Sequence, residues 1–155
     1  SSIIVRDVIK TTHCLVISPE LLGDREIQHV TELCEFPTIV LGTDKQHYHW
    51  HLHHIQQREE IDIPLQPRVK SNDLMGAYYA VLDGLGIADL PYLTVERDIA
   101  SGRLIHLLPE WCSNIGVVQL VYASRKGQRL VMEKLIEDLV DGIRAYAPKH
   151  DGYIL

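Results

Sequence analysis

The spacing of hydrophobic and polar residues changes several times along the chain, and each change predicts a different element. β-Branched and apolar residues dominate residues 8–17 and 38–42, and each run ends at turn-forming residues, which predicts two buried strands. Residues 26–34 are expected to form a short helix between them. Polar and apolar side chains alternate over residues 47–55, which predicts a strand with one solvated face, followed by a polar loop at 56–60.

The segment from residue 71 onward carries the clearest helix signals. Ser71, Asn72 and Asp73 are residue types that cap helix N-termini, apolar side chains follow at helical spacing, and Gly84 is placed to end the helix. Because Asn72 belongs to this cap, its replacement by Ala is expected to weaken helix initiation by about 1 kcal/mol. Gly86 is expected to form a tight turn into the next strand.

Strands and helices continue to alternate to the end of the chain. Strands are predicted at 87–90, 104–108 and 117–123, and helices at 92–101 and 129–146. The strand at 117–123 is nearly all apolar, as expected for a strand covered on both faces. The inward-facing positions of the last helix are predicted to be Leu135, Leu139, Val140 and Ile143. This alternation predicts an α/β fold with a mainly parallel sheet.

Composition narrows the class of protein. The chain has 155 residues, 46% of them hydrophobic and 23% charged, which is ordinary for one globular domain and excludes collagen and small disulfide scaffolds. A formal charge of -6 disfavours a surface that binds nucleic-acid phosphates. The cysteines are odd in number and widely spaced, which indicates a reducing compartment. Without a signal-peptide pattern or an apolar run of about 18 to 20 residues, we expect a cytoplasmic protein with no membrane partner.

Histidines are concentrated in the strand predicted at 47–55. One of its faces is predicted to carry His47, His49, His51 and His53, and the other Tyr48, Trp50 and Leu52. His-x-His spacing on a strand can bind Zn, Cu or Ni, and the alternative is a solvated polar face. No cysteine or well-placed carboxylate completes a metal site in the sequence, although Asp44 and His54 could contribute.

Catalytic signatures are weak, so an enzyme is not expected. The sequence has no Gly-x-Ser-x-Gly elbow, no phosphate-binding glycine loop and no His-Glu-x-x-His motif, and it implies no cofactor. Cys14 lies in an apolar strand and is expected to be an inert buried thiol. Redox sensing through Cys34 or Cys112 stays open as an alternative.

An ordered series of motifs covers nearly the whole chain. Ser71-Asn72-Asp73 precedes a helix, and after the helix comes Gly84-Leu85-Gly86-Ile87-Ala88-Asp89-Leu90-Pro91. Further parts of the series are Leu15-Val16-Ile17-Ser18-Pro19, Trp50, Gly102-Arg103-Leu104, and Leu120-Val121-Tyr122-Ala123-Ser124-Arg125 before an amphipathic helix. Together these motifs resemble the C-terminal half of the effector-binding domain of LysR-type transcriptional regulators. Leu108-Pro109-Glu110-Trp111 is similar to one subgroup of that family.

The resemblance implies an α/β fold like that of type II periplasmic binding proteins, in which two crossing strands join two subdomains around a small molecule. It assigns residues 1–17 to the end of the first subdomain and a crossing strand, 18–118 to the second subdomain, and 119–155 to a return strand and C-terminal helix. The chain begins without Met and enters an apolar run at once. The N-terminal helix-turn-helix and the first half of the sensor domain are therefore expected to be absent from it.

The function implied by the resemblance is effector sensing and oligomerisation within a sequence-specific DNA-binding regulator. Its expected partners are a small-molecule effector, further copies of the chain as a homodimer or tetramer, and DNA contacted only through the absent N-terminal domain. Two alternatives remain, a stand-alone small-molecule binding domain and a metal-responsive variant that uses the cluster from His47 to His54.

Effector contacts are expected at Ser71, Asn72, Asp73, Gly86 and Ile87. The free N–H groups and the positive dipole end of the helix after Asp73 could bind a carboxylate. The charge of Asp73 itself opposes an anion, and a plain N-cap is the alternative.

Overall fold

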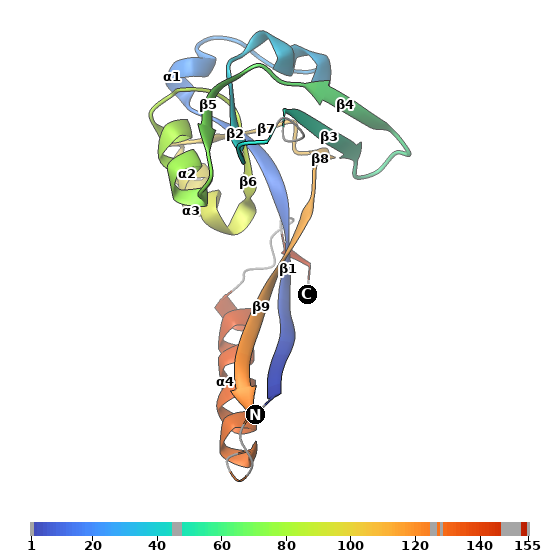
Figure 1. Ribbon diagram of the computed structural model, residues 1–155. Helices are drawn as coiled ribbons and strands as arrows, with labels where there is room; N and C mark the ends of the chain where they lie inside the picture. The colour runs from blue at the N-terminus through green and yellow to red at the C-terminus, as the bar shows by residue number, and fades with distance from the viewer. Residues whose placement is uncertain (1, 45–47, 125–126, 128, 147–152, 155) are drawn as a thin grey trace. The chain divides into compact units, whose positions relative to one another are not determined.

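A computed structural model describes residues 2–44, 48–124, 127, 129–146 and 153–154. The chain forms two compact units, one made of residues 1–12 and 115–155 and the other of residues 13–114. The first strand, β1 (Ser2–Ile17), contributes to both units (Figure 1). None of the helices in the described part of the chain has the length and apolar character needed to cross a lipid bilayer.

The unit of residues 1–12 and 115–155 is built on an antiparallel ribbon. The first part of β1 pairs with β9 (Ile115–Ser124), with one register irregularity, and the short β10 (Tyr153–Ile154) also pairs antiparallel with β1. The last helix, α4 (Arg129–Tyr146), forms at the predicted positions. Arg144 Nε of α4 donates a hydrogen bond of 3.1 Å to the Val8 carbonyl oxygen of β1.

Two burial predictions for this unit are wrong at particular residues. On α4, Val140 is buried as predicted, but Leu135 and Leu139 are 51% and 47% exposed, and Ile136 is buried in their place. Residues four apart lie on one helix face, so the packed row is 136 and 140 and the neighbouring apolar row stays in solvent. The strand predicted to be covered on both faces has Val121 64% exposed. Within the described residues, the apolar sequence of this strand therefore does not mean that both of its faces are covered.

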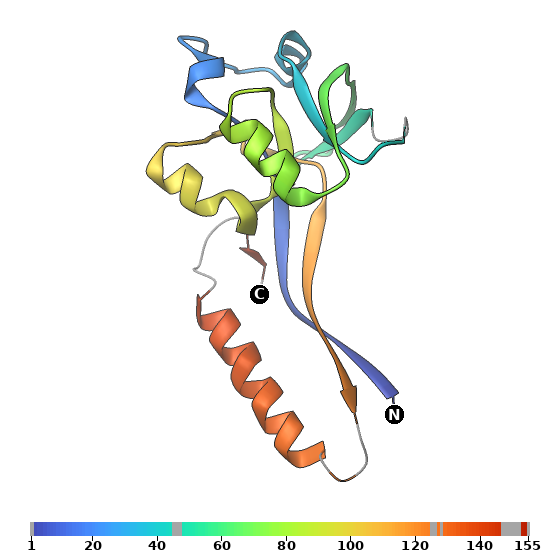
Figure 2. The ribbon, with the colours of Figure 1, turned by 60° about the vertical axis from the view of Figure 1, so that its left-hand side comes forward.

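The unit of residues 13–114 contains the larger core. The second part of β1 pairs antiparallel with β6 (Ala88–Pro91) and with β7 (Ile105–Leu107). Figure 2 shows α2 (Leu74–Leu82) and α3 (Tyr92–Ser101) on this unit, where both pack against β6. The main core cluster consists of Leu15, Ile17, Leu33, Val40, Trp50, Leu52, Ile63, Leu65, Ile87, Leu107 and Leu108.

The prediction of a mainly parallel sheet is wrong. Among the described residues, parallel pairing joins β2 (Thr38–Leu41) to β5 (Pro67–Ser71) and forms one isolated bridge between Thr38 and Ile87. The other strand pairs are antiparallel. Alternation of strands and helices did not predict this, because β1 pairs antiparallel with β6, β7 and β9, all of which are distant from it in sequence.

A three-stranded antiparallel sheet has the order β4–β3–β8, from β3 (His49–His54), β4 (Glu60–Pro64) and β8 (Trp111–Cys112). The sequence predicted β3 but neither β4 nor β5. Most residues of these two strands are exposed or half-buried, so the hydrophobic period is weak. Their prolines stand at strand ends, where a missing N–H is tolerated.

The short helices complete this unit. Helix α1 (Pro19–Leu22) begins at Ser18, whose Oγ accepts a hydrogen bond of 3.2 Å from the Leu21 N–H. The helix predicted at 26–34 is instead a 3₁₀ helix, η1 (Val30–Glu35). Glu32 folds back to accept N–H hydrogen bonds of 2.8 Å from both Gln28 and His29. These bonds hold residues 28 and 29 outside the helix.

Candidate ligand-binding site

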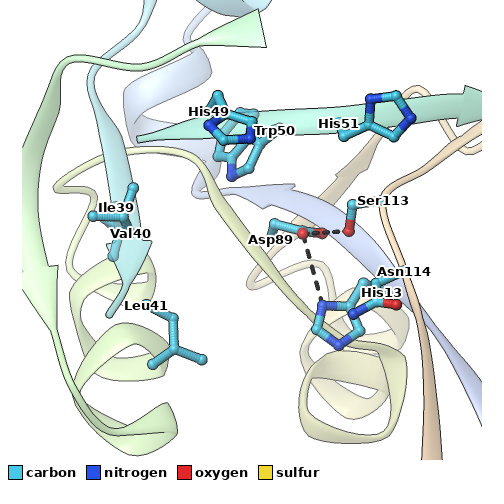
Figure 3. A pocket seen from close by; sticks show the side chains of 10 residues that line it. All are labelled: His13, Ile39, Val40, Leu41, His49, Trp50, His51, Asp89, Ser113 and Asn114. Carbon is cyan, nitrogen blue, oxygen red and sulfur yellow. Dashed lines mark hydrogen bonds and ion pairs between the residues drawn. The ribbon is translucent and has the colours of Figure 1, made fainter. Parts of the chain in front are cut away.

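A cavity of about 360 Å³ opens on the unit of residues 13–114 (Figure 3). Small-molecule sites in proteins usually measure about 300 to 1,000 Å³. Strands β1, β2, β3 and β6 and the segment after β8 all contribute to it. We call it the Asp89 cavity, and it is lined by His13, Ile39, Val40, Leu41, His49, Trp50, His51, Asp89, Ser113 and Asn114.

Asp89 is the polar centre of this cavity. Ser113 Oγ donates a short hydrogen bond to Asp89 Oδ2, and His13 Nδ1 lies 3.7 Å from the same oxygen (Figure 3). The side chain of Asp89 is only 13% exposed, and its Oδ1 is buried without a hydrogen-bond partner among the described residues. The carboxylate therefore keeps capacity to accept a further hydrogen bond.

β3 supplies one wall of the cavity, and its alternation follows the prediction. Trp50 and Leu52 are buried, while His49 and His51 are exposed. His47 lies outside the described residues. The histidine face and the buried face predicted for residues 49–52 are therefore confirmed, and the Trp50 indole presents an apolar surface beside the polar Asp89.

Carboxylates do face this histidine strand, contrary to the sequence prediction. Asp62 is the cross-strand partner of His51, with Asp62 Oδ1 2.7 Å from His51 Nδ1, and Glu60 Oε2 lies 3.5 Å from His51 Nε2. The hydrogen bond to Asp62, and then its charge, raise the pKa of His51 above its ordinary value. Residue spacing along one strand could not show this pairing, because β4 was not predicted. No group of three or more metal-ligating side chains is arranged for a metal ion within the described residues.

The loop before α2 does not line the cavity, but it follows β5, which pairs with the lining strand β2. Ser71 is the register partner of Leu41, which lines the cavity. Asp73 is the N-cap, and its Oδ1 accepts a hydrogen bond of 2.6 Å from the Gly76 N–H. Ser71 Oγ accepts from the Asp73 N–H at 3.3 Å and donates to the Asp73 carbonyl at 2.9 Å. The expectation that Asn72 caps this helix is wrong, because the side chain that caps it is that of Asp73.

Gly84 and Gly86 serve different purposes. Gly84 has a φ of +76°, and N–H groups after the helix bond back to carbonyls of its last turn, so its role as helix terminator is confirmed. Gly86 does not have a left-handed backbone. A Cβ there would lie 2.8 Å from the Pro37 carbonyl oxygen, so close backbone packing explains this glycine better than the predicted turn.

Ile87 is fully buried, and both of its backbone polar groups are bonded within the protein. Its N–H donates to the Pro37 carbonyl at 2.9 Å, and its carbonyl accepts from the Ile39 N–H at 2.8 Å. Gly86 and Ile87 thus hold the start of β2, three of whose residues, Ile39, Val40 and Leu41, line the Asp89 cavity.

The cysteines fall into two environments. Cys14 and Cys112 are buried and Cys34 is exposed. Burial raises the pKa of both buried thiols, which agrees with the inert thiol expected for Cys14.

Sequence reasoning missed His13, Asp89, Ser113 and Asn114 as site residues. They come from three separate segments that meet only in the folded unit. One signal was available, since Asp89 is a charged residue within an otherwise apolar strand.

Comparison with protein families matches residues 1–144 to the LysR substrate binding domain. The chain is 36% identical over 84 residues to the HTH-type transcriptional regulator PtxR of Pseudomonas aeruginosa, covering 54% of this chain and 27% of that protein. It is 29% identical over 156 residues to the HTH-type transcriptional regulator DmlR of Escherichia coli, covering 96% of this chain and 47% of that protein. The chain thus spans less than half the length of both regulators.

Among solved structures, the regulatory domain of AphB from Vibrio vulnificus matches with a TM-score of 0.70 and 25% identity, covering 88% of this chain and 70% of that domain. The expected mixed α/β architecture, like that of type II periplasmic binding proteins, is confirmed by these matches. The family match covers most of the chain and agrees with the motif series found in the sequence. The chain therefore belongs to the LysR substrate-binding domain family.

Proposed function

We propose that this chain is the effector-sensing part of a transcriptional regulator and binds a small molecule in the Asp89 cavity. The observation that carries the proposal is this cavity, of small-molecule size and with an under-used carboxylate, in a substrate-binding domain. Ligand binding shifts the balance between conformations of the intact regulator, provided that the ligand binds one conformation more tightly. The role is recognition without catalysis.

The proposed effector contacts include the loop of Ser71, Asn72 and Asp73. Support for this comes from Ser71, which is the cross-strand partner of the lining residue Leu41. The proposed contribution of Gly86 and Ile87 is to position the backbone of β2, since their own polar groups and surface face Pro37 and its neighbours.

The intact protein is proposed to act in the cytoplasm as a homodimer or tetramer. Contact with DNA is proposed to occur through an N-terminal helix-turn-helix that precedes the residues of this chain. The net charge of -6 supports a separate DNA-binding part, because an acidic domain repels phosphates.

The test uses the intact gene product and DNA from upstream of its own gene and of the neighbouring genes. Specific binding in a mobility-shift assay is expected, and a library of small metabolites should contain a compound that changes the affinity or the footprint. Failure of the intact protein to bind any of these DNA segments would contradict the regulatory function.

A further inference from the structure

We infer that the effector carries a protonated amine, which binds the carboxylate of Asp89. This inference rests on the proposed function and names the chemical class of the ligand of the same cavity. It follows from the charge of the cavity, the unused hydrogen-bonding capacity of the carboxylate and the apolar wall beside it.

Counted over the described residues that line the cavity, with histidine taken as neutral, the lining carries one formal charge, and that charge is negative. Asp89 is its only acidic residue, and neither Lys nor Arg is among the described residues that line it. Any positive charge on His51 is balanced by Asp62 and Glu60, which face that ring. A ligand carboxylate would therefore meet repulsion from Asp89, whereas an ammonium group would meet attraction.

Hydrogen bonds from the described residues do not use the full accepting capacity of the Asp89 carboxylate. Ser113 donates to Oδ2, but Oδ1 is buried without a partner among the described residues. His13 Nδ1 is 3.7 Å away, which is too far for a hydrogen bond. An alkylammonium group has three N–H donors and forms short charge-assisted bonds to carboxylates. Because Oδ1 has almost no accessible surface, the ligand would meet Oδ2, whose two lone pairs can accept a second hydrogen bond beside the one from Ser113.

The apolar side chains that line the cavity can contact a hydrocarbon group of the same ligand. Ile39, Val40 and Trp50 line the cavity with hydrocarbon and indole surface. The site thus favours a small amine with a compact apolar group over an acid of the same shape.

The experiment compares three probes that share one branched apolar body, namely isoamylamine, isoamyl alcohol and isovalerate. Each is titrated into the full ¹⁵N-labelled chain at neutral pH while the two tryptophan indole resonances are followed. Trp50 lines the cavity, whereas Trp111 lies against His54 and serves as an internal control. The variant Trp50→Phe assigns the two signals.

Isoamylamine is expected to shift the Trp50 signal and to bind about tenfold more tightly than the alcohol, the ratio for one charge-assisted hydrogen bond. Isovalerate is expected to bind most weakly. Asp89→Asn should abolish the preference for the amine. The matched control is Asp24→Asn, which removes the same charge at an exposed position outside the lining and should keep the preference.

Three results would overturn the inference: equal or tighter binding of isovalerate, an unchanged amine preference in Asp89→Asn, or no Trp50 shift with any probe. If Asp89→Asn does not fold, the wild-type ranking of the probes and its weakening by salt still decide the matter. The proposed function is tested separately, because DNA binding plays no part here. Failure of the intact protein to bind DNA would leave the amine preference standing.

Discussion

Gly86→Ala is expected to destabilise the unit of residues 13–114 because a methyl group at this position has no room. The added Cβ would lie 2.8 Å from the Pro37 carbonyl oxygen, 3.0 Å from the Pro37 carbonyl carbon and 3.1 Å from the Thr38 carbonyl carbon. All three are backbone atoms, so no flexible side chain can move aside. The strand start must shift, although it is held by hydrogen bonds of 2.9 Å and 2.8 Å to Ile87.

The magnitude follows from three contributions. Overpacking of a closely packed site costs about 1 to 3 kcal/mol. Each of the two backbone hydrogen bonds, if weakened, removes up to about 1 kcal/mol. Loss of glycine entropy in the unfolded chain offsets about 0.4 to 1 kcal/mol. The expected net loss is about 2 kcal/mol in the free energy of unfolding.

The assay is urea unfolding followed by tryptophan fluorescence. Both Trp50 and Trp111 lie in residues 13–114, so fluorescence reports on this unit. The control is Gly142→Ala in α4, where an added Cβ meets nothing within 4 Å. That change is expected to stabilise the helix by about 0.5 to 1 kcal/mol, seen by circular dichroism. A Gly86→Ala variant that unfolds within about 0.5 kcal/mol of wild type would refute the close-packing argument.

Further predictions concern local structure and reactivity. Asp73→Ala should lower the free energy of unfolding by about 1 kcal/mol through loss of the α2 cap, while Asn72→Ala should have little effect; equal losses in denaturant titrations would contradict this assignment. His51 should titrate above its ordinary pKa, and Asp62→Asn should lower that pKa in an NMR titration. Because the pKa of His51 is raised in the folded state, its interaction with Asp62 stabilises the fold fully below the pKa of an unfolded histidine. This stabilisation is lost as pH rises through the folded-state pKa. An unchanged His51 titration in the variant would argue against the pair. Of the three cysteines, only Cys34 is exposed, and it alone should react quickly with a thiol reagent in the native state; fast reaction of two or three thiols would contradict the described burial.

Much of the local structure could be predicted from sequence, since its causes lie within a few residues. The helix after Asp73 ends just before Gly84 because a cap and a terminator bracket a helical run of apolar side chains. The alternation of Trp50 with the exposed His49 and His51 follows from the two-residue period of a strand. The family was also recognisable, because its motifs are local and occur in order.

The tertiary structure decided which segments meet. Strand direction, the cross-strand pairing of His51 with Asp62, and the exposed row of α4 depend on partners that are distant in sequence, and no local period encodes them. The same is true of the contact that makes Gly86 necessary, since Pro37 reaches it only through the pairing of β2 with the residues before β6. Asp89, His13 and Ser113 form a polar site for the same reason. None of these residues predicts the site alone, and the partly satisfied carboxylate arises only where β1, β2, β3, β6 and the segment after β8 meet.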